Sequence, residues 1–363
     1  MVNAPSSAPN GHLSALVAVL SLLLFSTSAD LYWGYRDFTG QILPWWLVCF
    51  TIVGIAGKFC VPLLRAIKAG QFIREDGPQS HLQKSGTPTM GGIYVIPVGV
   101  GAALLSSGMA EQVWAASGLT VGFGLVGWWD DWQILRKKSN KGLSPKMKLI
   151  LQGLLALVFC GWLTLTRSWL DLTTIDLPFG WVLPLGIFFF PLALFVILGS
   201  TNATNLTDGL DGLAAGTGAI ALMGMALLIF PKDQALAKFC ACMAGSYLGF
   251  LWHNRHPAQV FMGDTGSLAL GGALAAIALI ANMLWGLLVV GLLFVWESIS
   301  VIAQVSYYKA TKNEQGVGKR LFKMAPYHHH LELSGWHETK IVLVFYGVAI
   351  GLVWMAIVLL QFG

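Results

Sequence analysis

Long apolar segments separated by short polar linkers make up most of the chain. Ten segments are long enough to cross a hydrocarbon core about 30 Å thick as helices. Their limits are 43–66, 91–109, 113–129, 147–167, 182–201, 212–230, 236–252, 265–282, 285–306 and 340–361. The continuous apolar stretch 268–305 would measure about 57 Å as one helix, so we expect it to break at 282–286. The pattern predicts an all-α, polytopic membrane protein of about ten transmembrane helices with no soluble domain.

The first part of the chain is harder to assign. Residues 13–25 form an apolar run of 13 residues, which is short for a membrane span. No Lys or Arg precedes this run, so it lacks the charged region of a signal peptide. We expect residues 1–42 to form a periplasmic or interfacial segment in front of a single transmembrane domain at 43–363.

The composition supports a membrane protein. The chain is 56% hydrophobic and only 11% charged, whereas soluble domains carry roughly 25% charged residues. Its five cysteines all lie in apolar stretches, which favours buried, reduced packing residues. No nucleic-acid partner is expected.

The distribution of basic residues predicts the orientation. Linkers that follow the odd-numbered segments hold 17 Lys and Arg, and the opposite side holds 4. The positive-inside rule makes the richer side cytoplasmic, and ten spans then place both termini in the periplasm.

Five polar clusters follow segments 1, 3, 5, 7 and 9, so the predicted topology puts all of them on the cytoplasmic side. Their limits are 84–92, 130–131, 202–212, 254–267 and 328–330. Polar groups near a bilayer are costly and often functional. We therefore expect one shared site.

Asp130 and Asp131 end an apolar segment. Two acids at a helix C-terminus meet the unfavourable end of the macrodipole, which argues for function over a merely hydrated helix end. Such a pair can hold a divalent cation, or one carboxylate can act as a base.

Asn205, Asp208 and Asp211 are spaced by three, which puts them on one face if they begin a helix. Helix capping is the alternative, but it accounts for one aspartate and not for three polar groups. Gly209 and Gly212 between them would let a ligand approach the backbone.

Asp264 lies in the string Gly-Asp-Thr-Gly-Ser at 263–267. A glycine-rich helix start forms an anion site, and a carboxylate within it is explained if a metal ion bridges it to a phosphate.

His328, His329 and His330 are consecutive, so their side chains diverge on regular structure and cannot share one ion. Phosphate or substrate hydrogen bonding, an acid–base role, or a solvated loop remain open. Glu297, inside the ninth segment, is expected to pair with a buried polar group or to mark a bend, and it stays outside the predicted catalytic set.

These clusters, in this order, resemble the polyprenyl-phosphate N-acetylhexosamine-1-phosphate transferase family. The similarity covers roughly residues 43–363 and is closest to the branch that makes the first lipid intermediate of peptidoglycan. The motifs that carry it lie at 87–92, 205–212, 261–267 and 325–333.

The resemblance implies a Mg²⁺-dependent transfer from UDP-N-acetylmuramoyl-pentapeptide to undecaprenyl phosphate, with UMP released. It also implies a bacterial inner-membrane location, a cytoplasmic cleft and a homodimer. A sister enzyme using UDP-N-acetylglucosamine is the alternative, although the three histidines argue against it. A transporter is the alternative from another class, but the clusters lie at segment ends and the sequence has no internal repeat.

The resemblance also assigns roles residue by residue. Asp264 would bind Mg²⁺, with Asp130 and Asp131 at the phosphates as further candidate ligands, and Asp130 is the favoured base. Lys84, Asp211 and Phe261 would lie by the uridine, with the backbone at Gly209 and Leu210. The rest of the cleft would be lined by Asn205, Asp208, Asn254, Ser267, His328, His329 and His330, with His328 in the catalytic set.

Lys146 resembles a phosphate-side lysine. There is one departure from the family pattern: Ile134 stands where a lysine commonly lies, and Arg136 or Lys137 could substitute.

Overall fold

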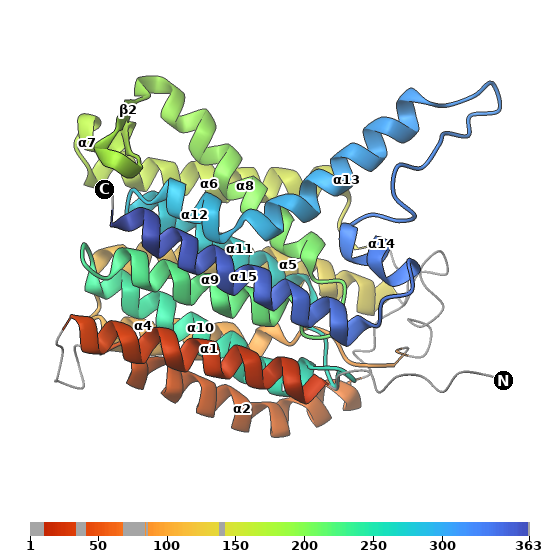
Figure 1. Ribbon diagram of the computed structural model, residues 1–363, viewed down its shortest axis with the longest axis horizontal. Helices are drawn as coiled ribbons and strands as arrows, with labels where there is room; N and C mark the ends of the chain where they lie inside the picture. The colour runs from red at the N-terminus through yellow and green to blue at the C-terminus, as the bar shows by residue number, and fades with distance from the viewer. Residues whose placement is uncertain (1–10, 34–40, 68–83, 85, 138–141, 362–363) are drawn as a thin grey trace.

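The computed structural model describes residues 11–33, 41–67, 84, 86–137 and 142–361. Within these ranges the chain is almost entirely helical, as predicted, and most helices lie side by side along the long axis of the molecule (Figure 1). The helices are α1 (Gly11–Tyr32), α2 (Leu43–Ala66), α4 (Gly92–Ser106), α5 (Glu111–Lys137), α6 (Pro145–Thr166), α7 (Trp169–Thr173), α8 (Phe189–Thr207), α9 (Leu213–Ile229), α10 (Gln234–Asn254), α11 (Gly263–Ile280), α12 (Leu284–Val290), α13 (Leu292–Ala310), α14 (Tyr327–Leu333) and α15 (Glu338–Leu360).

A small hairpin interrupts the helices between α7 and α8. Strands β1 (Thr174–Asp176) and β2 (Val182–Pro184) pair antiparallel, with Ile175 opposite Leu183. Short 3₁₀ turns, η1 (Pro178–Gly180) and η2 (Gly186–Phe188), follow each strand. The predicted span 182–201 is therefore corrected: its first residues belong to the hairpin, and the helix continues to Thr207.

Helix α9 lies at the centre of the bundle, and all of its residues are buried. A helix that is apolar on every side needs neighbours on every side, and α9 packs against α1, α10 and α15. Small residues allow the close approach. A side chain at Gly216 would overlap the Tyr346 ring, and one at Gly218 would overlap Leu270.

Seven helices in the described ranges are long and apolar enough to cross a membrane, or eight if the bent pair α12 and α13 counts as one span. The chain is thus a multi-pass membrane protein, but the count of ten spans is not confirmed. Helices α4 and α9 have only 15 and 17 residues, and α5 carries charges at its end.

The long apolar stretch breaks where predicted, since α11 ends at Ile280 and α12 begins at Leu284. A second break at Gly291 was not predicted. It turns α13 by 71° relative to α12, so that α13 projects from the bundle (Figure 1).

The expectation that the first apolar run is too short to cross is wrong, because α1 has 22 residues. Its polar residues have partners: Ser26 accepts a hydrogen bond from Trp46 Nε1 (3.0 Å), and Asp30 accepts two from the backbone at Ile42 and Leu43 (2.9 and 3.1 Å). These contacts fasten the end of α1 to the start of α2.

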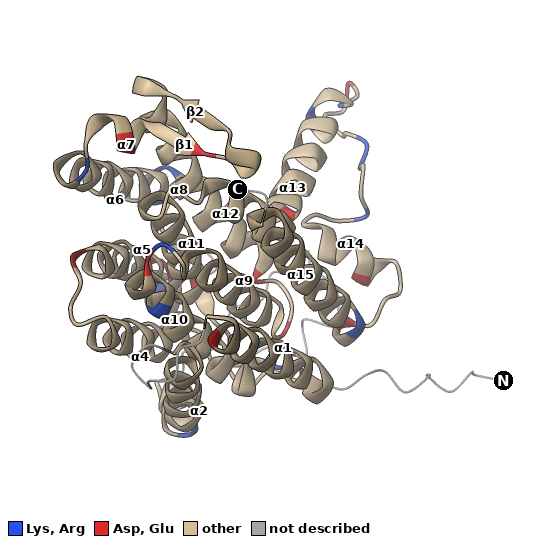
Figure 2. Ribbon diagram, turned by 60° about the vertical axis from the view of Figure 1, so that its left-hand side comes forward, with Lys and Arg blue, Asp and Glu red and all other residues tan. Residues whose placement is uncertain are grey.

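We call the end of the bundle where α11 and α15 begin the site end. Gly11 lies there, against the backbone of His256, whereas Leu360 ends α15 at the opposite end. The prediction that both termini share one side is therefore not confirmed for the described ends. The ribbon in Figure 2, coloured by residue type, places the charged residues largely at helix ends and in connecting segments.

Candidate active site

The end of α5 is joined to the start of α11 by Asp131. Its carboxylate accepts hydrogen bonds from the Asp264 N–H (3.2 Å), the Thr265 N–H (3.0 Å) and the Thr265 hydroxyl (2.7 Å). These backbone N–H groups belong to the first turn of α11, where a carboxylate is favoured. Gly127 permits the contact, since a Cβ there would lie 2.1 Å from the Asp264 carbonyl oxygen.

Four carboxylates gather at this junction; we call Asp130, Asp131, Asp208 and Asp264 the acid cluster. Asp264 Oδ1 accepts a hydrogen bond from Asn205 Nδ2 (2.8 Å), and Asp264 Oδ2 forms an ion pair with Lys148. The Asp130 carboxylate lies beside Asp264 and accepts a hydrogen bond from the Leu143 N–H (2.7 Å). The sequence therefore predicted correctly that these acids converge.

Asp208 is the member of the cluster whose ionisation is opposed by its surroundings. Within the described part of the chain its carboxylate has no hydrogen-bond partner. Burial and the negative charges of Asp264, Asp131 and Asp211 raise the pKa of Asp208 to about 8. At neutral pH Asp208 is therefore largely protonated, and ionising all four carboxylates requires more positive charge than Lys148, the one lysine that the described residues bring to the cluster, supplies.

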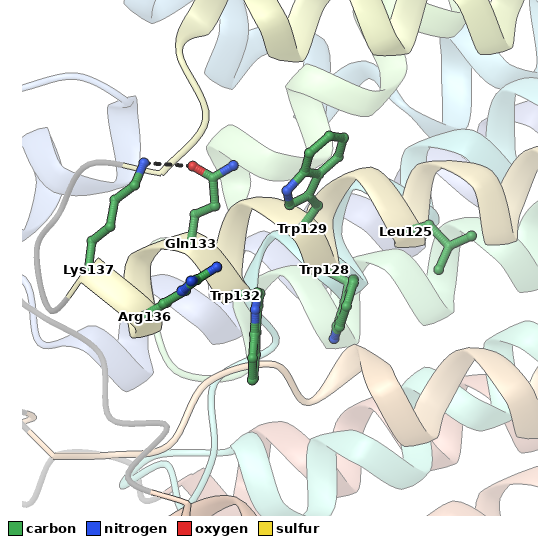
Figure 3. Close-up of a pocket in the computed structure, with 7 residues that line it drawn as sticks. All are labelled: Leu125, Trp128, Trp129, Trp132, Gln133, Arg136 and Lys137. Carbon is green, nitrogen blue, oxygen red and sulfur yellow. Dashed lines mark hydrogen bonds between the residues drawn. The ribbon is translucent and has the colours of Figure 1, made fainter.

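The lysine that contacts the acid cluster is one that the sequence did not single out. Lys146 is exposed, and Lys148, two residues further along α6, contacts Asp264. Arg136 and Lys137, which could have replaced the lysine missing at Ile134, lie on the outward face of α5 and line a different cavity (Figure 3). Lys148 thus makes the contact to Asp264, and a phosphate contact by Arg136 or Lys137 stays a prediction.

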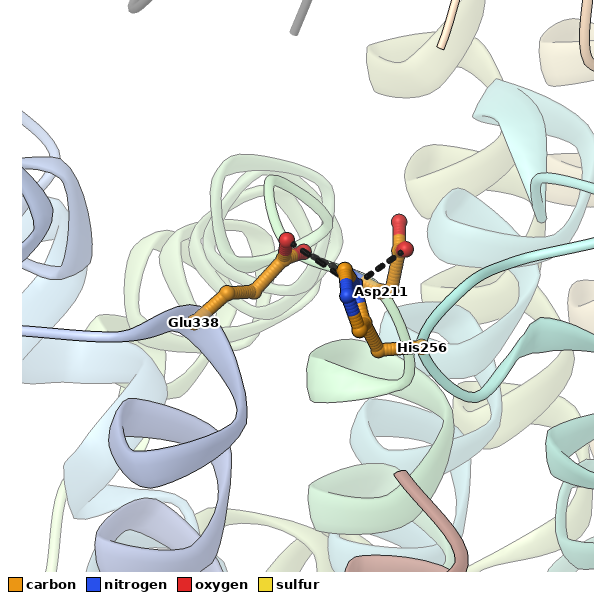
Figure 4. Close-up of side chains that lie close together, drawn as sticks. All are labelled: Asp211, His256 and Glu338. Carbon is orange, nitrogen blue, oxygen red and sulfur yellow. Dashed lines mark hydrogen bonds and ion pairs between the residues drawn. The ribbon is translucent and has the colours of Figure 1, made fainter. Parts of the chain in front are cut away.

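A second group, Lys84, Asp211, His256 and Glu338, forms what we call the ion-pair cluster. Lys84 Nζ lies 2.8 Å from Asp211 Oδ1 and 2.7 Å from Glu338 Oε1. His256 Nδ1 lies 3.1 Å from Asp211 and 3.3 Å from Glu338 (Figure 4). Glu338 Oε1 also accepts a hydrogen bond from the Asp211 N–H (2.6 Å).

Two cations and two anions make the ion-pair cluster close to neutral. Hydrogen bonds to Asp211 and Glu338, opposed by partial burial, raise the pKa of His256 to about 9, so this imidazole is charged at neutral pH. Asp211, His256 and Glu338 are close enough together to hold a metal ion. The Lys84 ammonium already bonds both carboxylates, and we therefore assign the group as an ion-pair network.

Of the three histidines, only His328 is fully buried. Its Nδ1 lies 3.1 Å from Glu297 Oε2, which confirms the expectation that Glu297 pairs with a buried polar group. His329 pairs with Glu332, and His330 Nδ1 accepts a hydrogen bond from the Lys323 N–H. The three rings thus have different partners, as their consecutive positions predicted.

The turn 208–212 joins these groups. Asp208 faces the acid cluster, Gly209 packs against His328 Nε2, and Asp211 belongs to the ion-pair cluster. Gly212 has φ +81°, a left-handed conformation that favours glycine. Its N–H donates to Asn254 Oδ1 (3.0 Å), which fixes the turn against the end of α10.

The remaining predicted residues lie around this turn. Ser267 accepts a hydrogen bond from Asn205 Nδ2 (2.9 Å), and Leu210 is buried. The Phe261 N–H donates to the Pro88 carbonyl (2.7 Å), which joins the segment before α11 to the segment before α4.

Sequence reasoning missed Lys148, His256, Glu297 and Glu338 as site residues. His256 lies inside a polar cluster that the sequence did identify, and Lys148 lies in a basic run. Glu338 gave little signal, because an acid in a first helical turn is ordinary.

Comparisons with known proteins show the family of the chain. Residues 113–282 match the model described as glycosyl transferase family 4, and residues 84–94 match phospho-N-acetylmuramoyl-pentapeptide-transferase signature 1. A phospho-N-acetylmuramoyl-pentapeptide-transferase of Synechococcus elongatus is 58% identical over 93% of both chains. That of Thermosynechococcus vestitus is 56% identical over 96% of this chain and 92% of its own.

The family match and these relatives place the helical bundle in the class of membrane-embedded transferases of glycosyl phosphates. Within that class, the chain belongs to the family of phospho-N-acetylmuramoyl-pentapeptide transferases.

Proposed function

We propose that the chain transfers phospho-N-acetylmuramoyl-pentapeptide from UDP-N-acetylmuramoyl-pentapeptide to undecaprenyl phosphate and releases UMP. The names of the relatives support the transferred group. The observation that carries the proposal is the acid cluster, in which four carboxylates face one lysine beside a glycine turn. Such a site attracts a cation, and a cation would attract phosphates.

In the proposed reaction an oxygen of the lipid phosphate attacks the sugar-linked phosphorus of the donor. The bond from that phosphorus to the bridging oxygen breaks, and UMP leaves with the electron pair. A phosphate monoester has a second pKa near 6, so the acceptor is largely ionised at neutral pH. The main obstacle is therefore the repulsion between two anions, and less the removal of a proton.

We propose Mg²⁺ as the cation of the acid cluster. Asp264 Oδ2 already accepts the Lys148 ammonium, which occupies a cation's position, and Asp208 is left without a countercharge among the described residues. Carboxylate oxygens are the ligands that Mg²⁺ prefers, so Asp264 and Asp208 fit it, with Asp130 adjacent. When bound, the ion would neutralise phosphate charge and orient the reacting groups.

The adjacent residues Asp130 and Asp131 have different proposed roles. Asp131 is engaged by three hydrogen bonds from α11, so it positions Asp264. The Leu143 N–H holds Asp130 Oδ1 beside Asp264, and the Asp130 carboxylate would accept the last proton of the lipid phosphate.

A single in-line displacement is the proposed route. Inversion at a chiral phosphorothioate would support it. Retention would instead require a covalent intermediate on an aspartate and would overturn it.

The ion-pair cluster is proposed as the donor side of the site. Lys84 and Asp211 would lie by the uridine with Phe261, Gly209 and Leu210, and the histidines would meet the sugar and phosphates. Glu338 and His256 hold Lys84 and Asp211 in place through short ion pairs.

We further propose that the site end faces the cytoplasm of the bacterial inner membrane. Most Lys and Arg of the chain belong to linkers at that end by the sequence topology. The acceptor's tail would reach the acids along α13, which projects from the bundle and exposes Trp296, Ile299 and Ile302. A homodimer is the proposed assembly.

The decisive assay measures UMP release by the purified protein. Release that requires both undecaprenyl phosphate and Mg²⁺ supports the proposal, and no release in their presence overturns it. UDP-N-acetylglucosamine run in parallel separates the sister activity, because the proposed enzyme should turn over the muramoyl-pentapeptide donor and leave this analogue unused.

A further inference from the structure

The outward face of α5 carries a cavity that the proposed reaction does not use. It has a volume of about 730 Å³ and is lined by Leu125, Trp128, Trp129, Trp132, Gln133, Arg136 and Lys137 (Figure 3). These positions recur at three- and four-residue intervals, so they form one stripe along the helix. Asp130 and Asp131 lie on the other side of α5 and are buried.

Along α5 the residues of this stripe change from apolar through aromatic to basic. Leu125 is apolar and exposed, Trp128 and Trp132 stack with ring centroids 6.0 Å apart, and Arg136 follows near the site end. From Leu125 to Arg136 the helix rises about 16 Å, close to half of a hydrocarbon core. The order of apolar, aromatic and basic groups therefore matches the order of acyl chain, interface and phosphate in one bilayer leaflet.

The charges at the polar end call for an anion. None of the described residues that line the cavity is acidic. Lys137 Nζ donates to Gln133 Oε1 (2.7 Å), and Arg136 makes no ion pair within the described ranges of the chain. Two neighbouring cations without a carboxylate are complementary to a phosphate group.

We propose that this cavity binds an anionic phospholipid of the surrounding bilayer, with its phosphate at Arg136 and Lys137 and its chain along Trp132, Trp128 and Leu125. The acceptor substrate fits less well, because its phosphate would be separated from Asp264 by the width of α5. A second copy of the chain also fits less well, because a symmetric contact centred here would oppose two basic pairs.

The test uses the full chain in nanodiscs of phosphatidylglycerol and phosphatidylcholine. Native mass spectrometry counts the lipids retained on the released protein. The wild type should retain phosphatidylglycerol, and R136Q/K137Q should retain roughly thirtyfold less, because each of the two basic contacts to an anionic lipid contributes about 1 kcal/mol. K319Q/R320Q is the matched control, since it removes two exposed charges outside the cavity and should retain the wild-type amount.

A second measurement needs no variant. A photoactivatable phosphatidylglycerol should crosslink to the wild type within residues 125–137.

Several outcomes would overturn the proposal. These are crosslinks elsewhere only, equal retention of phosphatidylcholine, unchanged retention in R136Q/K137Q, displacement of the crosslinker by undecaprenyl phosphate, or dissociation of a dimer in that variant. None of them bears on UMP release, so the transferase proposal is tested separately.

Discussion

The acid cluster and the ion-pair cluster lie on either side of the turn 208–212, yet their charges are balanced differently. The acid cluster has four carboxylates and one lysine, whereas the ion-pair cluster has two carboxylates, Lys84 and a charged His256. A site with excess negative charge requires a cation from outside. The nearly neutral ion-pair cluster requires no added cation, and its ion pairs can hold its own side chains in position.

The largest expected effect comes from Asp264→Asn. Removing this charge should lower the rate of UMP release by about 10³-fold or more, because the proposed cation loses its central ligand. Mg²⁺ should raise the melting temperature of the wild type and not of the variant. Asp176→Asn, at an exposed ion pair with Lys232, is the control and should keep full activity.

Lys148→Gln should have the next largest effect, because it removes the positive charge that pairs with Asp264. The acid cluster becomes more negative, so the apparent affinity for Mg²⁺ should rise while turnover falls roughly tenfold to hundredfold. Steady-state kinetics over a Mg²⁺ series measure both. The exposed Lys146→Gln is the matched control, and an equal loss in that variant would contradict the assignment of Lys148.

Glu338→Gln tests the balanced cluster. The variant leaves Lys84 with one carboxylate partner, so KM for the nucleotide donor should rise about tenfold while kcat changes less. The exposed Glu111→Gln, in the first turn of α5, is the control. A loss in kcat alone would mean that Glu338 acts on the chemistry and not on donor binding.

The smallest effect is the pH dependence at His256. Its pKa is raised from 6.5 to about 9, so the stabilisation it provides is complete below about pH 6.5 and is lost as pH rises through about 9. Between pH 8 and 10 the melting temperature of the wild type should therefore fall further than that of His256→Gln. The difference should be a few degrees at most, because the imidazole is one-third exposed.

Much of the fold could be predicted from the apolar pattern, and the parts that could not depended on tertiary contacts. The break near Asn282 follows from length alone. The sequence predicted too short an apolar run for helix α1, because Ser26 and Asp30 are polar. In the structure these side chains hydrogen-bond to Trp46 and to the backbone at the start of α2.

The candidate site, too, could be predicted only in part from the sequence. Convergence of the acids followed from the alternation of spans and linkers. The choice between Lys146 and Lys148 did not, because two positions on a helix point about 200° apart and the sequence does not fix which of them faces α11. Glu297 could be expected to have a partner, but only packing shows that the partner is His328.

The turn 208–212 limits how this protein can change. Gly209 has no room for a side chain beside His328, Gly212 holds a conformation that other residues rarely adopt, and the two aspartates between and before them face different neighbours. An antibiotic that bound against the backbone of this turn would therefore leave few viable routes to resistance by point mutation at the turn itself.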